Sequence, residues 1–391
     1  MRKYIIKNKF LIIFFAIFIL LIILFTFFFI TTKNTTTTLN ASLLSAQDNV
    51  KKLEKELSDL KNQDQFKRNE ILQAEIKNLE LSYSKAVKMY ETIQDLDDQK
   101  IKTTSYKEKL TLALSYLSKR NFASGSAELT TLEKQITSDQ QKTAATSTSP
   151  AIANAPSSNT PPGTGFSTQK VTTEIGEYTV SLIAADMGST RIIVDTASDS
   201  DCRDNCPVLS LGDYVSRNGA FAGINGSYFC PASYPSCAGK TNTFDTLLMN
   251  KNKTYFNSDN NVYSSVPVVV FGGGFMRFIG QSSGWGRDTS VDSVLANQPL
   301  LLSGGNITFS GDGDPKKGSK GSRSFVGNKG STAYIGVVYN ATVAEGAYAL
   351  KALGLENALN LDSGGSTALW SGGYKVGPGR NIPNAILFVR K

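Results

Sequence analysis

The segment Asn357-Ala358-Leu359-Asn360-Leu361-Asp362-Ser363-Gly364-Gly365-Ser366-Thr367-Ala368-Leu369 combines a short apolar run with a turn rich in glycine and hydroxyl groups. Residues 358–361 predict a buried strand, and Asp362 follows where that strand gives way to the turn. Two glycines then permit positive φ and close approach of a ligand to the backbone. A carboxylate at a strand end beside backbone donors suits an anionic or sugar ligand. A tight turn that Asp362 merely caps is the alternative explanation of this pattern.

The sequence contains no histidine, which narrows the chemistry that a site can use. Ser-His-Asp catalysis, Cys-His catalysis and histidine-ligated metal sites are therefore excluded. The 391 residues carry a formal net charge of +8, of which Arg2, Lys3, Lys7 and Lys9 contribute four charges. The other basic residues are scattered and are not interleaved with aromatic side chains, so no nucleic-acid partner is predicted.

Residues 10–30, FLIIFFAIFILLIILFTFFFI, are 21 consecutive residues with one hydroxyl group and no charge. A helix of this length can cross a bilayer. Because residues 1–9 are basic, we expect a cytoplasmic N-terminus and an exported remainder. A cleaved signal peptide is the competing interpretation, but the run is long for one and the following TTKNTTTTLN has no A-x-A site. The sequence predicts an uncleaved, single-pass anchor.

Residues 41–136 are polar, nearly free of glycine and proline, and patterned for helices. Apolar residues keep a/d spacing in two runs of different phase, at Val50, Leu53, Leu57 and Leu60 and again from Ile76 to Ile93. A lone amphipathic helix, a helical hairpin and a parallel coiled coil are all compatible with these runs. Two further helices are expected on either side of Lys119-Arg120-Asn121. We expect a stalk that self-associates or binds a protein partner and carries no catalytic residue.

Residues 137–169 are rich in Ser, Thr, Ala and Pro, which predicts a disordered tether. From Lys170 onward, short β-rich runs alternate with turns rich in Gly, Asn and Asp, and two helices are predicted at Leu211–Asn218 and Thr342–Leu353. The second helix is expected to end at Gly354. This region is long enough to bury a core. We therefore expect residues 170–391 to form an α+β domain of mixed β-sheets with few helices, which carries the function.

Four cysteines lie within one short window, at Cys202, Cys206, Cys230 and Cys237. Four thiols allow three disulfide pairings, and a zinc site with four thiolates is the intracellular alternative. The six residues between Cys230 and Cys237 are too many for an ordinary zinc knuckle. Given the export signal, two local disulfides are favoured, Cys202–Cys206 and Cys230–Cys237.

Polar turns at strand ends form an ordered set of motifs in this region. They are Ile224–Phe229, Pro299–Gly305, Arg323–Gly327, Asn360–Thr367 and Arg380–Leu387. In this order, with a helix before the fourth, they resemble the phosphodiester glycosidase family over roughly residues 221–389. The family pattern has glycine where this chain has Ser227 and Ser363. Ser363 adds a side chain beside the candidate carboxylate, which puts substrate choice or turnover in question.

The resemblance implies hydrolysis of a sugar-1-phosphodiester between the anomeric carbon and the phosphate. Arg323 and Arg380 would bind the phosphate, since guanidinium groups pair bidentately with phosphate oxygens. Asp362 would be the acid/base carboxylate or would stabilise positive charge at the anomeric carbon. The other substrate-binding candidates are residues of the motifs that could contact sugar or phosphate: Asn225, Gly226, Tyr228, Asn360, Gly364, Gly365, Ser366, Thr367 and Asn384.

Each assignment has a purely structural alternative. The arginines could be surface ion-pair residues, the asparagines could hold turn geometry, and Glu345 is expected on a solvated helix face. Asp312 and Asp314 resemble the start of a calcium loop but lack its later acidic ligands, so neither a metal nor a cofactor is predicted.

The anchor and the resemblance together predict a membrane-bound hydrolase of the bacterial cell envelope that acts on phosphate-linked glycans. A non-catalytic surface module that binds phosphoglycan is the main alternative, and Ser363 favours it. A third interpretation is an adaptor in which the stalk recruits partners and the C-terminal domain is a spacer.

Overall fold

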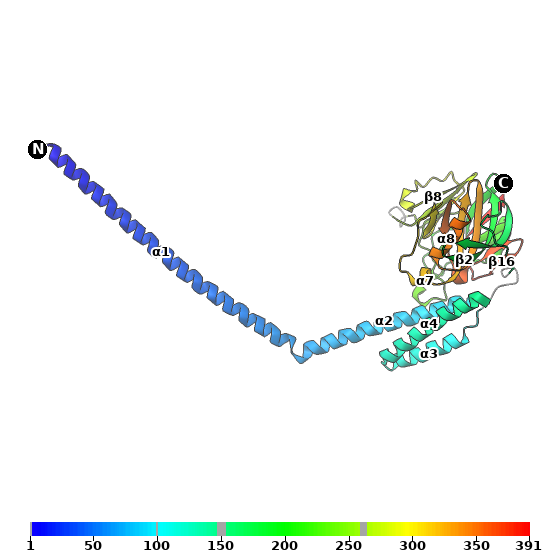
Figure 1. Ribbon diagram of the computed structural model, residues 1–391, viewed down its shortest axis with the longest axis horizontal. Helices are drawn as coiled ribbons and strands as arrows, with labels where there is room; N and C mark the ends of the chain where they lie inside the picture. The colour runs from blue at the N-terminus through cyan, green and yellow to red at the C-terminus, as the bar shows by residue number, and fades with distance from the viewer. Residues whose placement is uncertain (1, 99–100, 147–153, 259–263) are drawn as a thin grey trace. The chain divides into compact units, whose positions relative to one another are not determined.

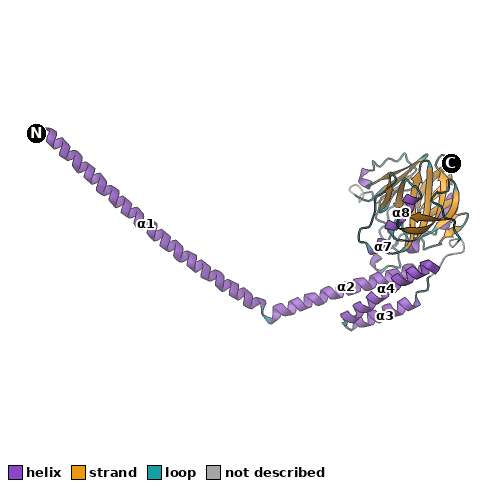
Figure 2. Ribbon diagram, viewed as in Figure 1, coloured by secondary structure: helices purple, strands orange, loops and turns teal. Residues whose placement is uncertain are grey.

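The computed structural model describes residues 2–98, 101–146, 154–258 and 264–391 (Figure 1). The chain divides into two compact units, one ending at Asn78 and one spanning Leu79–Lys391. The first unit is helical, and the second contains both helices and β-sheets (Figure 2).

The first unit contains α1 (Arg2–Lys61) and the beginning of α2 (Asp64–Asp98). The side chains of residues 14–30 are exposed along α1 rather than packed into a core. Among the described residues, Phe14–Lys61 is the one segment long and apolar enough to cross a membrane. The helix continues without a break through the threonine-rich segment, where the Thr31 and Thr35 hydroxyls donate to backbone carbonyls one turn earlier. The predicted apolar span is thus part of a longer helix.

The second unit begins with a small helical bundle. It is formed by residues 79–98 of α2, by α3 (Thr104–Ser118) and by α4 (Phe122–Thr146). Ile93, Leu117 and Leu132 are buried where the three helices meet. The two helices expected around Lys119–Asn121 are therefore present, and they pack with α2 in one bundle.

The segment for which the sequence predicts disorder, residues 137–169, is structured at both ends. Helix α4 continues to Thr146, and strand β1 (Gly165–Thr173) begins inside the segment. Before β1, the chain lies along that strand, because the Gln169 amide donates to the carbonyls of Ser158 (2.7 Å) and Thr160 (3.0 Å). Such polar ordering needs no large apolar side chain, so composition does not reveal it. The remaining part of the tether, residues 147–153, lies outside the described residues.

Three sheets form most of the rest of the second unit, and all strand pairs in them are antiparallel. The first sheet has seven strands in the order β1, β2 (Gly176–Asp186), β13 (Thr332–Ala341), β12 (Gly321–Lys329), β14 (Asn357–Asn360), β10 (Leu300–Ser303) and β11 (Asn306–Ile307). The second has five: β16 (Tyr374–Val376), β15 (Leu369–Ser371), β4 (Ala222–Asn225), β17 (Asn384–Arg390) and β3 (Thr190–Thr196). The third has five: β6 (Tyr255–Phe256), β5 (Leu248–Met249), β9 (Ser293–Ala296), β7 (Val268–Gly272) and β8 (Phe275–Ile279).

The three sheets share one apolar core, to which Val326, Ile224 and Leu295 contribute from the first, second and third sheet. Helix α8 (Val343–Ala352) covers the other face of the first sheet, and α6 (Leu211–Asn218) packs on the second. The predicted fold class, a β-sheet domain with few helices behind an apolar helix and a helical region, is confirmed.

Local sequence explains both of these helices. Ser210 with Asp213 and Thr342 with Glu345 form capping boxes, in which each side chain bonds the backbone N–H of the other. Glu345, expected on a solvated face, therefore caps its own helix, and its carboxylate also pairs with Lys320 (2.6 Å).

The cysteines are paired in the way that the sequence favoured, Cys202 with Cys206 and Cys230 with Cys237. Disulfides persist in oxidising compartments. Together with the apolar N-terminal helix, they indicate a secreted or extracytoplasmic domain.

Candidate active site

A pocket of about 350 Å³ opens where the C-terminal ends of β4 and β14 meet the N-terminal end of β12. The backbone of Asp362, two residues after β14, is fixed there by β4. Its N–H donates to the Gly226 carbonyl (3.0 Å), and its carbonyl accepts from the Asn225 amide (2.6 Å). These bonds place the carboxyl group at the pocket wall.

Six of the twelve residues predicted to be catalytic or substrate-binding line this pocket. They are Asp362, Arg323, Arg380, Tyr228, Gly364 and Ser366. The other six candidates, which do not line it, are Asn225, Gly226, Asn360, Gly365, Thr367 and Asn384. The motifs therefore supply both the surface of the pocket and a layer behind it.

The Asp362 carboxyl group lies in surroundings that disfavour its charge. Burial raises the pKa of Asp362 to about 6. A hydrogen bond from the Ser366 hydroxyl, the charge of Arg380 and the Ser363 N–H (2.9 Å) oppose that rise. A carboxyl group with this pKa exchanges protons near neutral pH, which acid/base catalysis requires.

Arg323 reaches the pocket from β12 and is held by backbone carbonyls. Its Nε donates to Ala341 (2.9 Å), and its Nη2 donates to Lys316 (3.0 Å) and Ser319. Burial lowers the pKa of Arg323. Carbonyl partners orient the guanidinium without neutralising its charge, so an anion in the pocket would be attracted to it.

Arg380 reaches the pocket from the last motif, and its side chain is 11% exposed. Its Nη2 pairs with Asp95 and with Asp98 (2.9 Å), both on α2. Burial lowers the pKa of Arg380, but the charges of Asp95, Tyr234 and Asp98 outweigh this effect and raise it overall. The Arg380 Nε is buried without a hydrogen-bond partner in the described part of the chain. The guanidinium lies over Gly365, where a Cβ would collide with it.

Asn225, at the end of β4, lies behind the pocket and joins that strand to β12 and to the segments that follow β14 and precede β15. Its Oδ1 accepts from the Ser324 hydroxyl (2.9 Å) and the Ala368 N–H (3.2 Å), while its Nδ2 donates to the Asp362 carbonyl. The residue has no exposed surface. Both ends of the amide are thus directed at the protein, and the residue positions Asp362.

Asn384 plays a comparable part beside Gly226. Its Oδ1 accepts from the Ser227 N–H (2.9 Å), and its Nδ2 donates to the Ser227 hydroxyl (3.0 Å). The amide fills the space that a Cβ at position 226 would need, which explains the glycine there. Ser227, which departs from the family pattern, fits because its hydroxyl bonds the same asparagine.

Asn360 connects the buried layer to the pocket. Its Nδ2 donates to the Tyr228 hydroxyl (2.6 Å) and to the carbonyl of Gln298 (3.1 Å). Burial raises the pKa of Tyr228, so the phenol stays protonated. Within the described residues, the Asn360 Oδ1 and the Thr367 Oγ1 are buried without a hydrogen-bond partner.

Ser363, the second departure from the family pattern, lines the pocket. Its hydroxyl accepts from the Ser324 N–H (3.3 Å) and donates to the Leu361 carbonyl (3.3 Å). The side chain is thus turned toward the backbone of the neighbouring strands. The pocket keeps its opening beside Asp362 despite the added group.

Sequence reasoning missed several residues of the pocket wall. Tyr234 comes from the loop that the Cys230–Cys237 disulfide closes, and Lys316 comes from α7 (Pro315–Gly318). The position of two cysteines directly after the first motif could have indicated the loop. Thr92, Asp95 and Leu96 of α2 also line the pocket, and no pattern in the helical segment pointed to them.

In the loop that resembles the start of a calcium site, Lys317 lies beside the carboxylates of Asp312 and Asp314. Lys317 Nζ bonds Asp312 and lies 3.8 Å from Asp314. In the described residues, no group of three or more acidic or cysteine side chains has the arrangement of a metal site.

The chain was compared with protein-family models, curated proteins and solved structures. Residues 218–389 match the model of a family described as phosphodiester glycosidase. A hypothetical protein from Synechocystis is similar in structure, with 14% identity and a TM-score of 0.44; the match covers 57% of this chain and 62% of that one. No curated protein matches the sequence.

Two further solved structures are similar. The catalytic domain of zebrafish N-acetylglucosamine-1-phosphodiester alpha-N-acetylglucosaminidase, auto-inhibited by its pro-peptide, has 13% identity and a TM-score of 0.44, over 61% of this chain and 87% of that one. A putative exported protein from Burkholderia pseudomallei has 11% identity and a TM-score of 0.36, over 55% and 74%.

Proposed function

Because residues 218–389 belong to the phosphodiester glycosidase family, we propose that this chain hydrolyses a sugar-1-phosphodiester, such as one of N-acetylglucosamine-1-phosphate, in cell-envelope glycans. One observation carries the proposal. A carboxyl group with a pKa near 6, Asp362, shares one pocket with two arginines, Arg323 and Arg380. A phosphodiester substrate needs both an anion site and a carboxyl group beside the anomeric carbon.

In the proposed reaction, the oxygen of water bonds to the anomeric carbon, the bond between that carbon and the phosphate oxygen breaks, and the proton that water loses passes to the leaving phosphate or to solvent. The leaving phosphate gains negative charge, which Arg323 and Arg380 neutralise. Preorganised cations of this kind lower a barrier by on the order of 3 kcal/mol. Asp362 either transfers a proton or stabilises positive charge at the anomeric carbon.

The asparagines take different parts in this proposal. Asn225 and Asn384 hold the backbone at Asp362 and Ser227, so we assign them to positioning rather than to sugar contact. Asn360 orients the Tyr228 hydroxyl. Tyr228 and the turn after Asp362 are then the groups that would meet the sugar and its phosphate.

The test uses the full chain in detergent micelles with its disulfides intact. Release of N-acetylglucosamine from its α-linked methyl phosphodiester is measured for wild type and for Asp362→Asn. The variant should lose about 100-fold or more in kcat and still bind the substrate. Asp292→Asn, which removes a carboxylate that does not line the pocket, is the matched control and should keep wild-type activity. Equal activity of wild type and Asp362→Asn would refute the role of this carboxyl group.

A non-catalytic phosphoglycan-binding module is the second candidate, and the presence of Ser363 in the pocket wall favours it. It predicts saturable binding of phosphoglycan without turnover. In that case Ser363→Gly, which restores the family residue, should leave binding intact. Appearance of turnover in Ser363→Gly alone would instead show that the serine blocks catalysis.

We further propose that residues 10–30 anchor the chain with its N-terminus in the cytoplasm and the glycosidase domain on the bacterial cell surface. The apolar helix and the disulfides support this arrangement. Protease added to intact cells should then reach the domain. Full protection of the domain, with digestion only after lysis, would contradict it.

A further inference from the structure

Helix α2 presents acidic side chains to the pocket. Glu91, Asp95 and Asp98 are spaced four and three residues apart, which places them on one helix face. Asp95 pairs with Arg380 and accepts a hydrogen bond from the Tyr234 hydroxyl (2.5 Å). Asp98 also pairs with Arg380 (2.9 Å). The helix thus supplies two carboxylates to the same guanidinium.

Glu91 extends this contact along the helix. Its carboxylate accepts from the Ser236 hydroxyl and pairs with Lys316 Nζ (3.4 Å). The Glu91 side chain is 7% exposed. The Lys316 side chain is 55% exposed, so water weakens this ion pair, whereas the hydrogen bond from Ser236 reaches the buried carboxylate of Glu91.

The Asp95 carboxylate lies over the glycine-rich turn itself. Its carboxyl carbon is 3.6 Å from the position that a Cβ at Gly364 would take. Asp95 is therefore surrounded by Arg380, Tyr234 and Gly364, which line the pocket in which the phosphate is proposed to bind. A carboxylate resembles a phosphodiester here, since each offers two oxygens that share one negative charge.

Packing of the bundle does not require these residues to face the pocket. Asp97, between Asp95 and Asp98, instead bonds Thr103 and pairs with Lys107. Between residues 91 and 98, the helix therefore has one acidic residue directed at its own bundle and three directed at the pocket wall. The bundle core is apolar and is built from other positions, including Ile93 and Leu96.

We propose that Asp95 and Asp98 occupy the anion subsite of the pocket, formed by Arg380, Tyr234 and the turn at Gly364, so that α2 and an anionic substrate exclude each other. This inference rests on the proposed function only in naming the substrate as a phosphodiester. Substrate binds after α2 leaves Arg380. Any interaction that stabilises or weakens the contact of α2 with Arg380 therefore changes the affinity of the pocket for substrate.

The effect on affinity follows from the fraction of molecules in which the subsite is open. The apparent dissociation constant equals the intrinsic one divided by that fraction. If α2 occupies the subsite for about nine-tenths of the time, its release strengthens binding about tenfold. The value of kcat is unchanged, because the helix is absent from the complex that reacts.

Two other roles of Asp95 predict different kinetics. Many glycosidases use a pair of carboxyl groups, so Asp95 could act with Asp362 as a second catalytic group. Its removal would then lower kcat. If the contact is merely structural, removal would change neither affinity for anions nor KM.

The test compares Asp95→Asn/Asp98→Asn with wild type in the full chain, in detergent micelles. Asp97→Asn is the matched control, since it removes a neighbouring charge that pairs with Lys107 in the bundle. Binding of inorganic phosphate is measured by calorimetry, and kcat and KM are measured with the methyl phosphodiester. We expect about tenfold tighter phosphate binding and about tenfold lower KM at constant kcat in the double variant, and no change in the control.

Glu91→Gln provides a second variant that leaves both partners of Arg380 in place. It weakens the contact with Ser236 and Lys316, and it should also tighten phosphate binding, by a smaller factor. Unchanged or weaker phosphate binding in the double variant would overturn the proposal, as would a large fall in kcat.

The phosphate measurement separates this proposal from the proposed function. If no variant releases sugar but the double variant binds phosphate about tenfold more tightly, the hydrolase proposal fails and the competition by α2 stands. If wild type releases sugar and phosphate binding does not respond to the variants, the hydrolase proposal stands and the competition by α2 fails.

Discussion

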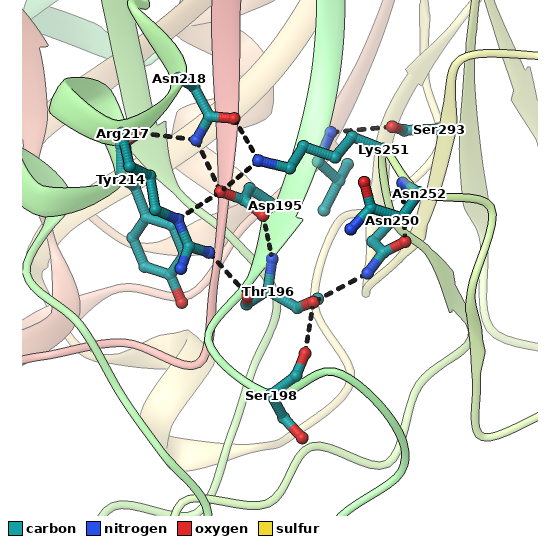
Figure 3. Close-up of polar contacts among 11 residues, drawn as sticks. Asp195, Thr196, Ser198, Tyr214, Arg217, Asn218, Asn250, Lys251, Asn252 and Ser293 are labelled. Atoms are coloured by element: carbon teal, nitrogen blue, oxygen red, sulfur yellow. Dashed lines mark hydrogen bonds and ion pairs between the residues drawn. The ribbon is translucent and has the colours of Figure 1, made fainter.

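Asp195 on β3 accepts four hydrogen bonds with one carboxylate, which makes its replacement a quantitative test of how the second sheet is held (Figure 3). Its Oδ2 accepts from Arg217 Nε (2.6 Å), Asn218 Nδ2 (2.6 Å) and Lys251 Nζ (3.3 Å). Its Oδ1 accepts from the N–H of Thr196 (3.0 Å). The carboxylate thereby joins the end of α6 and the turn after β5 to β3.

Replacement by asparagine keeps the shape of the side chain and removes both the charge and one acceptor. Because all four partners are donors, the new NH₂ group must face at least one of them, and an unsatisfied donor costs about 1–3 kcal/mol. Loss of charge weakens the remaining bonds by about 1 kcal/mol each. Arg217 and Lys251 are 37% and 27% exposed, so water offsets part of this loss. We expect Asp195→Asn to lower the free energy of unfolding by about 3 kcal/mol.

Tryptophan fluorescence is the appropriate assay, since the two tryptophans, Trp285 and Trp370, both lie in the β-sheet region. In a domain of this size, 1 kcal/mol corresponds to about 2–4 °C, so Tm should fall by about 6–12 °C. Asp292→Asn is the control, because it breaks a more exposed pair with Arg191 and should cost under about 1 kcal/mol. A shift for Asp195→Asn no larger than that of the control would refute the reasoning.

Two further predictions concern the pocket. The pKa of Asp362 in the folded chain, about 6, lies above its ordinary value, so the folded state binds this proton more tightly than the unfolded state. Asp362 therefore contributes stability below about pH 4 that is lost as pH rises through about 6. Urea unfolding should show Asp362→Asn becoming more stable relative to wild type across that interval. A difference in unfolding free energy between the two proteins that stays constant with pH would argue against the raised pKa. Gly365→Ala places a Cβ against the Arg380 guanidinium, and calorimetry should show at least about tenfold weaker phosphate binding. Gly273→Ala, whose Cβ would meet open space, should bind phosphate like wild type, and equal affinity of both variants would contradict the assigned role of Arg380.

The sequence predicted those parts of the fold that depend on local chemistry. The helices α6 and α8 lie where the sequence predicted them, and the capping boxes at Ser210 and Thr342 explain where they begin. The fold class followed from alternation of β-rich runs and turns. The motif residues of the pocket could be recognised because a carboxylate, two arginines and a glycine-rich turn recur together in one order.

The direction of a side chain could not be predicted in the same way. Asn225 and Asn384 are the residue types that bind sugars, and their amides instead bond Ser324, Ala368 and Ser227. The choice between a ligand and a protein partner depends on which strands meet at that point. Strand pairing joins residues far apart in sequence, so a motif alone does not show which partner an amide will bond.

The acidic face of α2 shows this limit most clearly and also explains how the two arginines differ. Glu91, Asp95 and Asp98 have the spacing of an ordinary solvated face, and the partner of Asp95 is 285 residues away. Arg323 is held by carbonyls that leave its charge available, whereas Arg380 is paired with two carboxylates. In the proposed site, an incoming phosphate would therefore approach Arg323 at once but would have to displace α2 from Arg380. Of the two cations, it is Arg380 through which the helical segment would set the affinity of the pocket.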